Sequence, residues 1–284
     1  MLARSSSTVA LLIAAFAGAG LAAAELASQV FPASKAEVAA KGAFGEFKKL
    51  LAGETRGMKD LLTGVAVIEP GEAIHPPHQH AEEEFLLLAQ GEGTWHLDGG
   101  ESAAREGDLL YVAPWVMHGL KNTSKAPLTF FVVKWNGQGL AVPEPPAAGA
   151  ASGPSSGIRG EIASKVIHRD DVKPELGPAG DLRRYWNGVA TRGLRDVVTG
   201  CAVLNPGQEV HPPHQHAEEE FIYLLKGRGA WHLDGNELDA SAGDLLYTQS
   251  WTLHGLKNTS SEPLAFYILK WNAAALPVPE KPVR

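Results

Sequence analysis

The sequence is poor in cysteine, has no excess of basic residues and contains no long apolar run after its N-terminal segment. Its single cysteine, Cys201, cannot form a disulfide within the chain, and its position in a strand-like segment favours a small apolar packing role. Lys and Arg number 25 against 32 Asp and Glu, which gives a formal net charge of -7. This acidic balance argues against nucleic acid or an anionic membrane as a partner.

The first 24 residues have the features of a secretory signal peptide in the required order. A positive charge at Arg4 comes first, an apolar run over 9–23 follows, and Ala22-Ala23-Ala24 offers a small-residue cleavage site. The run is shorter than the roughly 20 residues that a membrane span needs. We therefore predict cleavage near Ala24 and a periplasmic or secreted protein without membrane attachment.

The rest of the chain is an internal duplication. The segment HPPHQHAEEEF occurs at 75–85 and again at 211–221, and a constant offset of 136 residues relates 55–134 to 191–270 without a gap. A repeat of this length is a whole small domain. We predict an N-terminal domain over 25–142, a linker rich in Pro, Ala, Gly and Ser over 143–160, and a C-terminal domain over 161–284.

Short strands separated by turns dominate each repeat. Alternating or β-rich segments that end in Gly, Pro or Asp predict strands in the first repeat over 64–68, 84–88, 94–97, 108–112 and 128–135. This spacing indicates an all-β sandwich or barrel. Two short segments, 45–51 and 181–185, are candidates for helices.

Each repeat carries a compact set of candidate metal ligands. His78 and His80 are spaced so that both imidazoles lie on one face of a strand, Glu84 lies just beyond them, and His118 comes from a later strand. The matching set in the second repeat is His214, His216, Glu220 and His254. Three neutral imidazoles and one carboxylate suit a first-row divalent metal, and an octahedral ion would keep two positions for water, substrate or oxygen.

At these residues the chain resembles the cupin superfamily, and its two copies resemble a bicupin. The first motif of that family, G-x5-H-x-H-x3,4-E-x6-G, is matched over 78–91 and over 214–227, although the leading glycine stands one place early. The motif spacing selects the third glutamate of each EEE triplet as the ligand. Glu82 and Glu83 are then expected to be turn or rim residues.

The second motif of the family, G-x5-P-x-G-x2-H-x3-N, is matched less completely. The ligand histidine and Asn122 are present, as is Asn258 in the other half, but the inner glycine is absent and Ser250 replaces the proline. The resemblance implies two tandem double-stranded β-helix, or jelly-roll, barrels with a His3Glu site in each. It also implies two divalent transition metals per chain, with manganese or iron favoured and copper, nickel or zinc as alternatives.

Four further paired histidines are candidate acid–base residues: His75, His96, His211 and His232. His75 and His211 precede Pro-Pro, where either an acid–base role or a strand-end hydrogen bond fits. His96 and His232 each follow a tryptophan, and strand alternation must send either the tryptophan or the histidine inward. The sequence leaves both choices open.

The other paired residues are expected to be structural. Tyr111 with Tyr247 and Lys134 with Lys270 are predicted to be structural or solvent-facing. The paired arginines occur in the turn sequence TRG. The paired tryptophans are expected to pack between elements, with stacking on a substrate ring as the alternative.

A full ligand set in both repeats favours an enzyme, because a storage or structural protein needs no metal. We expect an oxygen-dependent oxidoreductase of the dioxygenase or oxidase/decarboxylase type, acting on a small organic anion or polyphenol. The alternatives are a non-redox isomerase or lyase on a sugar acid and a non-catalytic periplasmic metal or ligand-binding protein. The expected partner is a small-molecule substrate, and assembly as a homo-oligomer stays open.

Overall fold

The computed structural model describes residues 25–147 and 161–283, which consist mainly of β-strands. Helical structure in these ranges is limited to two 3₁₀ turns, η1 (Ala33–Lys35) and η2 (Arg169–Asp171), and none is long and apolar enough to cross a membrane. The expected all-β class is confirmed. The predicted signal segment, 1–24, and residues 148–160 of the predicted linker lie outside the described residues.

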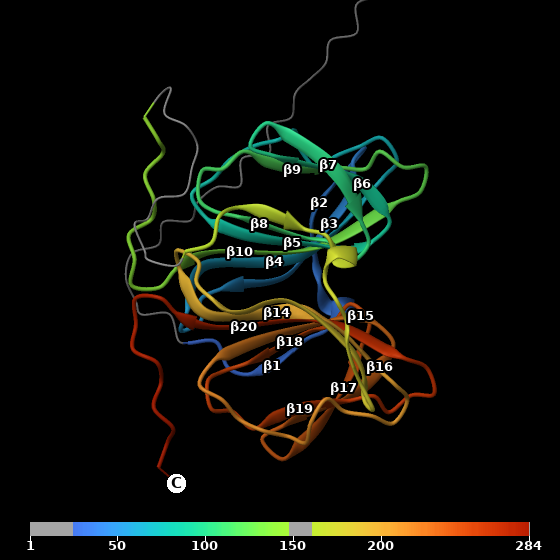
Figure 1. The fold of residues 1–284 in the computed structure, drawn as a ribbon, viewed down its shortest axis with the longest axis vertical. Helices are drawn as coiled ribbons and strands as arrows, with labels where there is room; N and C mark the ends of the chain where they lie inside the picture. The colour runs from blue at the N-terminus through green and yellow to red at the C-terminus, as the bar shows by residue number, and fades with distance from the viewer. Residues whose placement is uncertain (1–24, 148–160, 284) are drawn as a thin grey trace, which may run out of the picture.

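The N-terminal half is a seven-stranded sheet facing a three-stranded sheet (Figure 1). The larger sheet has the order β11-β8-β5-β10-β4-β3-β2, and its strands are β2 (Glu37–Gly42), β3 (Gly45–Gly53), β4 (Met58–Ile68), β5 (Glu83–Gln90), β8 (Leu109–Val112), β10 (Leu128–Gly137) and β11 (Lys165–Ile167). In the smaller sheet, β6 (Glu92–Leu97) lies between β7 (Gly100–Arg105) and β9 (His118–Lys121).

The C-terminal half repeats this jelly-roll architecture. Its larger sheet has the order β1-β18-β15-β20-β14-β13-β12, and its strands are β1 (Gln29–Phe31), β12 (Glu175–Gly177), β13 (Gly180–Val189), β14 (Leu194–Leu204), β15 (Glu219–Lys226), β18 (Leu245–Thr248) and β20 (Leu264–Ala273). In its smaller sheet, β16 (Arg228–Leu233) lies between β17 (Asn236–Ser241) and β19 (His254–Lys257).

The two expected helices are strands, so that prediction was wrong. Residues 45–51 belong to β3 and residues 181–185 to β13. In β3 the apolar residues Phe47, Leu50 and Leu51 have helical spacing, but the strand pairs with β4 through a register shift between Lys49 and Leu51. A bulge of this kind places two neighbouring residues opposite one, so strand pairing accommodates a pattern that otherwise favours a helix.

The two halves exchange their first strands. β1 pairs with β18 of the C-terminal half, and β11 pairs with β8 of the N-terminal half. The end of each exchanged strand is fixed by a carboxylate of the other half: the Ala33 amide donates to Asp244 Oδ1 at 2.8 Å, and the Arg169 amide donates to Asp108 Oδ1 at 3.0 Å. The exchange covers the edges of β8 and β18, which would otherwise expose unpaired backbone groups.

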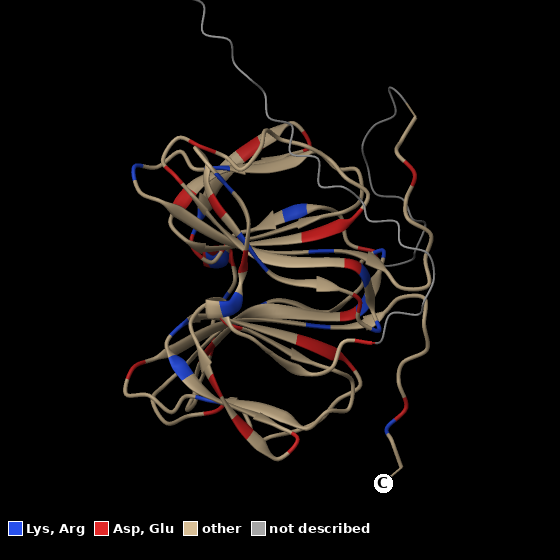
Figure 2. Ribbon diagram, turned by 180° about the vertical axis from the view of Figure 1, so that it is seen from behind, with Lys and Arg blue, Asp and Glu red and all other residues tan. Residues whose placement is uncertain are grey.

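The halves pack together through their seven-stranded sheets, which lie next to each other in the centre of the molecule (Figure 1). The ring of Phe131 on β10 stacks on the ring of Tyr223 on β15, with centroids 4.2 Å apart. One hydrophobic cluster contains buried residues of both halves. Acidic and basic residues are distributed over both halves (Figure 2).

Two buried glutamates also join the halves. Because consecutive strand residues face opposite sides, Glu83 points toward the other half while Glu84 points into its own barrel. The Glu83 carboxylate accepts hydrogen bonds from the amides of Arg192 at 3.0 Å and Gly193 at 2.7 Å, and from the Tyr111 hydroxyl at 2.7 Å. Glu83 is only 2% exposed, so the expectation of a turn or rim residue was wrong for it.

Glu219 makes the reciprocal contact with the TRG turn of the N-terminal half. It accepts hydrogen bonds from the amides of Arg56 at 3.2 Å and Gly57 at 2.7 Å, and from the side chains of Thr55, Tyr247 and Trp271. A Cβ atom at Gly57 would lie 2.9 Å from the carboxylate, so the close approach requires glycine. The predicted turn role of the two TRG segments is confirmed.

Candidate metal centre

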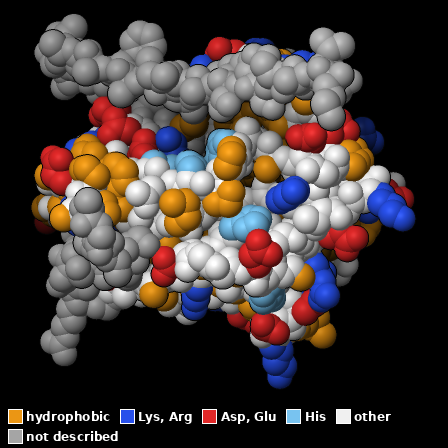
Figure 3. Space-filling view, turned by 90° about the horizontal axis from the view of Figure 1, so that it is seen from above, with side chains coloured by type: hydrophobic (Ala, Val, Ile, Leu, Met, Phe, Trp, Pro, Cys, Tyr) orange, Lys and Arg blue, Asp and Glu red, His pale blue; other side chains and the backbone are white. Residues whose placement is uncertain are grey.

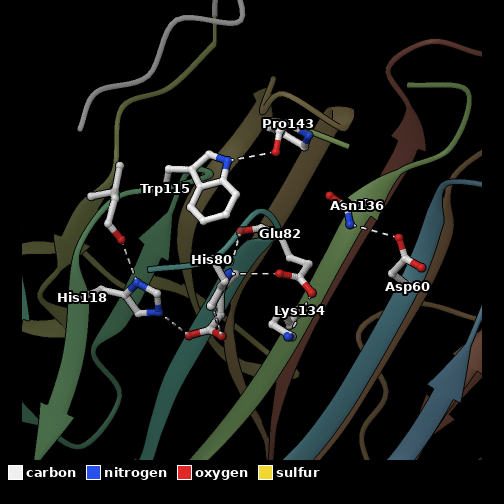
Figure 4. A network of polar contacts seen from close by, with 10 residues as sticks. Asp60, His80, Glu82, Trp115, His118, Lys134, Asn136 and Pro143 are labelled. Carbon is white, nitrogen blue, oxygen red and sulfur yellow. Dashed lines mark hydrogen bonds and ion pairs between the residues drawn. The ribbon is translucent and has the colours of Figure 1, made fainter. Parts of the chain in front are cut away.

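The four predicted ligands of the N-terminal half come together inside its barrel. The ring nitrogens of His78, His80 and His118 lie within 4.8 Å of one another. The Glu84 carboxylate lies 3.3 Å from Nε2 of His80 and 3.3 Å from Nε2 of His118. Figure 4 shows the positions of His80 and His118. These residues belong to three segments: the extended stretch before β5, β5 itself and β9.

The segment that carries His78 and His80 is held in place by backbone pairing. His78 and His118 form an isolated antiparallel bridge, in which each amide donates to the other residue's carbonyl at 2.9 and 2.8 Å. The Trp115 amide donates to the His80 carbonyl at 2.7 Å, and Trp115 has a positive φ of 61°. An aromatic residue rarely adopts this conformation, so contacts with the surrounding structure must hold the strained Trp115 backbone in place next to the ligands. No pattern in the sequence predicts this contact.

The C-terminal half has the same geometry. His214, His216 and His254 form the second group of three histidines, and the Glu220 carboxylate lies 3.4 Å from Nε2 of both His216 and His254. Trp251 matches Trp115, with a φ of 61° and an amide that donates to the carbonyl of His216 at 2.7 Å.

In two ligand histidines of each half, a backbone carbonyl fixes which ring nitrogen faces the centre. Nδ1 of His80 donates to the Glu82 carbonyl at 3.1 Å, and Nδ1 of His118 donates to the Val116 carbonyl at 2.9 Å. The equivalent carbonyl contacts of His216 and His254 are 3.0 and 2.8 Å. The Nε2 lone pairs therefore point at the carboxylate, the arrangement that orients histidine toward a metal.

The donor set fits a divalent ion. The Nε2 atoms of His80, His118, His216 and His254 are buried and make no hydrogen bond within the described residues. Buried polar atoms rarely lack partners, and two such nitrogens facing one carboxylate in each half are donors that a divalent cation would satisfy. The residues of each half can thus supply three imidazoles and one carboxylate to one ion.

Burial and neighbouring charges keep these groups in the protonation states of ligands. Burial lowers the pKa of His78 to about 3 and that of His214 to about 4, so both imidazoles are neutral at pH 7. Burial alone would raise the pKa of Glu84, but the imidazoles of His118 and His80 hold it well below its usual range. The same balance lowers the pKa of Glu220.

The candidate acid–base histidines fall into two groups. His75 and His211 are exposed, and each ring centroid lies 3.9 Å from that of a ligand histidine, His78 or His214. In β6 and β16 the tryptophans point inward, with Trp95 fully buried. His96 faces the other way and lies 3.1 Å from Glu101. His96 and His232 are thus not members of the two candidate metal-binding groups of three histidines.

The other paired aromatic residues pack as expected. Four of the paired tryptophans are fully buried: Trp95, Trp135, Trp231 and Trp271. Trp115 and Trp251 are partly exposed, and their indole N–H groups donate to the carbonyls of Pro143 at 2.9 Å and Pro279 at 2.8 Å. Tyr111 and Tyr247 are buried against Glu83 and Glu219, which confirms their structural role. Seen from above, histidine side chains reach the surface among apolar ones (Figure 3).

A cavity of about 580 Å³ opens onto the candidate ligands of the C-terminal half. Its lining includes His214, Glu220 and His254, with His211 at the same cavity. The rest of the wall is largely apolar, with Lys270 among its few charged residues. A cavity of this volume can hold a small organic molecule.

Fold and site together define a protein of two jelly-roll barrels with one His3Glu group in each. The family model for the cupin domain matches residues 64–134 and 200–270, which together make up half of the chain. The chain therefore belongs to the cupin domain family, and the presence of two such domains makes it a bicupin.

Two proteins are similar to part of the chain. It is 38% identical over 69 residues to gentisate 1,2-dioxygenase from a Streptomyces species, covering 24% of this chain and 19% of that protein. It is 35% identical over 63 residues to the oxalate-binding protein of Thermotoga maritima, covering 22% of this chain and 52% of that protein. The matched region thus spans about a fifth of the length of the dioxygenase and about half of the length of the oxalate-binding protein.

The structure also resembles that of oxalate decarboxylase from Bacillus subtilis. The TM-score is 0.62 at 16% sequence identity, and the alignment covers 86% of this chain and 77% of the other. At this identity the likeness concerns the fold, and it extends over both barrels.

Proposed function

We propose that this protein is a metal-dependent oxidoreductase that uses molecular oxygen on a small organic anion. The observation that carries the proposal is the C-terminal His3Glu group at the cavity of about 580 Å³. Gentisate and oxalate, named in two of the similar proteins, are both small carboxylates. Proteins of one fold can have many functions, which depend on the individual site, so the pocket supports the proposal more strongly than the fold similarity does.

The proposed cofactor is one divalent transition metal in each half, with manganese or iron favoured over copper, nickel or zinc. When bound, such an ion supplies a Lewis-acidic centre with open positions for small oxygen ligands. The protein's own residues orient the ligand groups and exclude water from the substrate. The carbonyl of Thr252 holds the imidazole of His254, Glu220 supplies one negative charge, and the apolar wall keeps water from the substrate.

A second candidate is a non-redox lyase or isomerase. His211 lines the cavity, and its ring centroid lies 3.9 Å from that of His214. An exposed imidazole at the edge of a substrate cavity is placed to act as a general acid or base. This reaction would use the same cavity and the same ligands but would need no oxygen.

Oxygen consumption separates the candidates. The full chain, loaded in turn with manganese and with iron, is mixed with a panel of small carboxylates and polyphenols while oxygen and products are followed. Oxygen uptake that depends on one substrate, and is lost in the double variant His214→Ala/His216→Ala, is the expected result. Product formation without oxygen would overturn the proposed oxidoreductase activity and support the lyase or isomerase. Binding of a compound without formation of any product would indicate a ligand-binding protein and overturn both proposed enzyme activities.

We further propose that the protein acts outside the cytoplasm, as the N-terminal segment 1–24 suggests. Mass spectrometry of the exported protein should find a chain that begins near Glu25. An intact Met1 on exported protein would contradict this.

A further inference from the structure

The two barrels differ at one position that decides how much space lies beside the ligands. Phe47 on β3 is paired with Ala66, and Leu182 on β13 is paired with the equivalent Ala202. Directly opposite residues of antiparallel strands point to the same face, so both side chains face the barrel interior. The larger side chain is in the N-terminal half.

Phe47 occupies the space that is open in the C-terminal half. A Cβ atom built at Gly64 would lie 2.5 Å from Cζ of Phe47, so the ring covers this glycine. The equivalent Gly200 lines the cavity, as does Leu182. Two neighbouring differences act in the same direction, because Val198 replaces Leu62 and Ala179 stands where the N-terminal half has Phe44.

The lysines beside the two metal sites also differ, although both halves have one at the same position. Lys134 is paired with Glu84 across the strands, and Lys270 with Glu220, so each lysine lies next to the carboxylate ligand. The Lys134 ammonium donates to Glu82 Oε1 at 3.1 Å (Figure 4). Its charge is therefore compensated.

Lys270 has no such partner. It lines the cavity and makes no hydrogen bond or ion pair with the residues that the structure describes. Glu218, the counterpart of Glu82, lies 3.4 Å from Nδ1 of His216, the same distance as Glu82 from Nδ1 of His80, but among the described residues it forms no ion pair with Lys270. The Glu220 carboxylate contacts His216 and His254, so the partly buried Lys270 ammonium forms no ion pair, and an anion that enters the cavity would compensate its charge.

The apolar wall adds a second requirement for the ligand. Apart from the charged groups, the residues that line the cavity include Leu204, Ile222, Leu256, Phe266 and Ile268. These side chains favour an apolar or aromatic body. A ligand that satisfies the whole cavity therefore carries one anionic group and one apolar part.

We propose that only the C-terminal half binds the substrate, and that Lys270 holds an anionic group of an otherwise apolar molecule such as an aromatic carboxylate. The N-terminal half, closed by Phe47, has a metal site without a substrate cavity. This inference rests on the proposed function because it places that reaction in one barrel and specifies the substrate class.

Benzoate and its neutral isostere benzamide test the proposal. Each is titrated by calorimetry into the metal-loaded full chain and into the variants Lys270→Met and Lys134→Met. One benzoate per chain should bind with a dissociation constant below about 10 mM. Lys270→Met should weaken benzoate binding by about tenfold or more and leave benzamide unchanged, since the loss concerns a charge-assisted contact. Lys134→Met should change neither by more than about twofold.

A second pair of variants tests the cavity itself. Leu182→Phe should abolish the binding of both compounds, while Phe47→Leu should leave the C-terminal site as it is. Metal content, measured in every variant, should stay at two ions per chain and so show that the ligand groups are intact. Equal effects of the two lysine variants, two benzoates per chain, or no benzoate binding to the unaltered protein would overturn the proposal.

These outcomes are distinct from those of the oxygen assay. If no substrate consumes oxygen but benzoate binding depends on Lys270, the proposed reaction fails and the binding site stands. If oxygen is consumed but both lysine variants have the same KM, the reaction stands and the role of Lys270 fails.

Discussion

The two halves have nearly the same ligand geometry but different surroundings. The carboxylate lies 3.3 Å from the two imidazoles in the N-terminal half and 3.4 Å in the C-terminal half. Beside these equal groups, the Phe47 ring covers Gly64 in one barrel, whereas the equivalent Gly200 lines a cavity in the other. The comparison teaches that metal ligation and substrate space are separate properties of this fold, because the ligands and the cavity walls belong largely to different residues.

The contacts between the halves show a smaller difference. Both Glu83 and Glu219 accept two backbone amides and a tyrosine hydroxyl from their surroundings. Trp271 donates its indole N–H to Glu219 at 2.9 Å, whereas the indole N–H of Trp135 has no partner among the described residues. Glu219 is therefore the better satisfied of the two.

The largest effect is expected when the ligands of one half are removed. His78→Ala/His80→Ala and His214→Ala/His216→Ala should each reduce the metal content from two ions to one, because one histidine and one carboxylate hold an ion poorly. Turnover should fall by about a thousandfold or more only in the C-terminal variant. Elemental analysis and turnover are measured on both. Unchanged metal content in both would show that these histidines are not ligands, and equal losses of turnover would make the halves equivalent.

The glutamates between the halves should give the next largest effect. Glu219→Ala and Glu83→Ala each leave buried amides and a tyrosine hydroxyl without an acceptor, so each should lower the free energy of unfolding by about 3 kcal/mol. Glu219→Ala should cost about 1 kcal/mol more, because the Trp271 indole also loses its partner. Urea denaturation measures both. The substitution of an exposed glutamate, Glu101→Ala, is the control and should change the free energy of unfolding by no more than about 0.5 kcal/mol. If Glu83→Ala and Glu219→Ala have effects as small as this control, the contacts between the halves do not stabilise the fold.

Removal of β1 should affect the half to which it is bound and not the half from which it comes. A chain that begins at Pro32 lacks the partner of Leu245, Leu246 and Tyr247 in β18. Backbone amides of β18 should exchange hydrogen about tenfold faster, because local opening no longer requires β1 to detach. β8, still paired with β11, is the control within the same molecule. Faster exchange in β8 than in β18 would contradict the strand exchange.

The smallest effect concerns the pH dependence of the metal-free protein. Burial holds the pKa of His78 at about 3 and of His214 at about 4, below the ordinary 6.5. The unfolded chain therefore binds more protons, and stability that is complete above about pH 6.5 is lost as the pH falls toward these lower values. Urea denaturation of chelator-treated protein between about pH 7 and pH 4 measures the slope.

Replacing each of these histidines by asparagine should flatten that slope. His78→Asn should flatten it more than His214→Asn, because the pKa of His78 is depressed further. A slope that stays the same in both variants would show that other groups dominate the acid response of the protein.

Much of the fold and the ligand set could be predicted because their signals are local or repeated. His78, His80 and Glu84 lie within one short segment, and the same spacing recurs in the second half. The predicted strand segments lie in β4, β5, β6, β8 and β10, where alternation and turn residues agree with the pairing. Residues 45–51 were predicted wrongly because pairing with β4 overrode a local helical pattern.

The duplication, the all-β class and the residues of the two candidate ligand groups could be predicted from the sequence alone, because all three depend on spacing along the chain. The packed structure was needed to show that Glu83 joins the two halves and that Trp95, not His96, points inward. It also distinguished Lys134 from Lys270, which are the same residue at the same place in the repeat. Their difference depends on the position of Glu82 and on the space beside Leu182, and such contacts arise only when distant parts of the chain pack together.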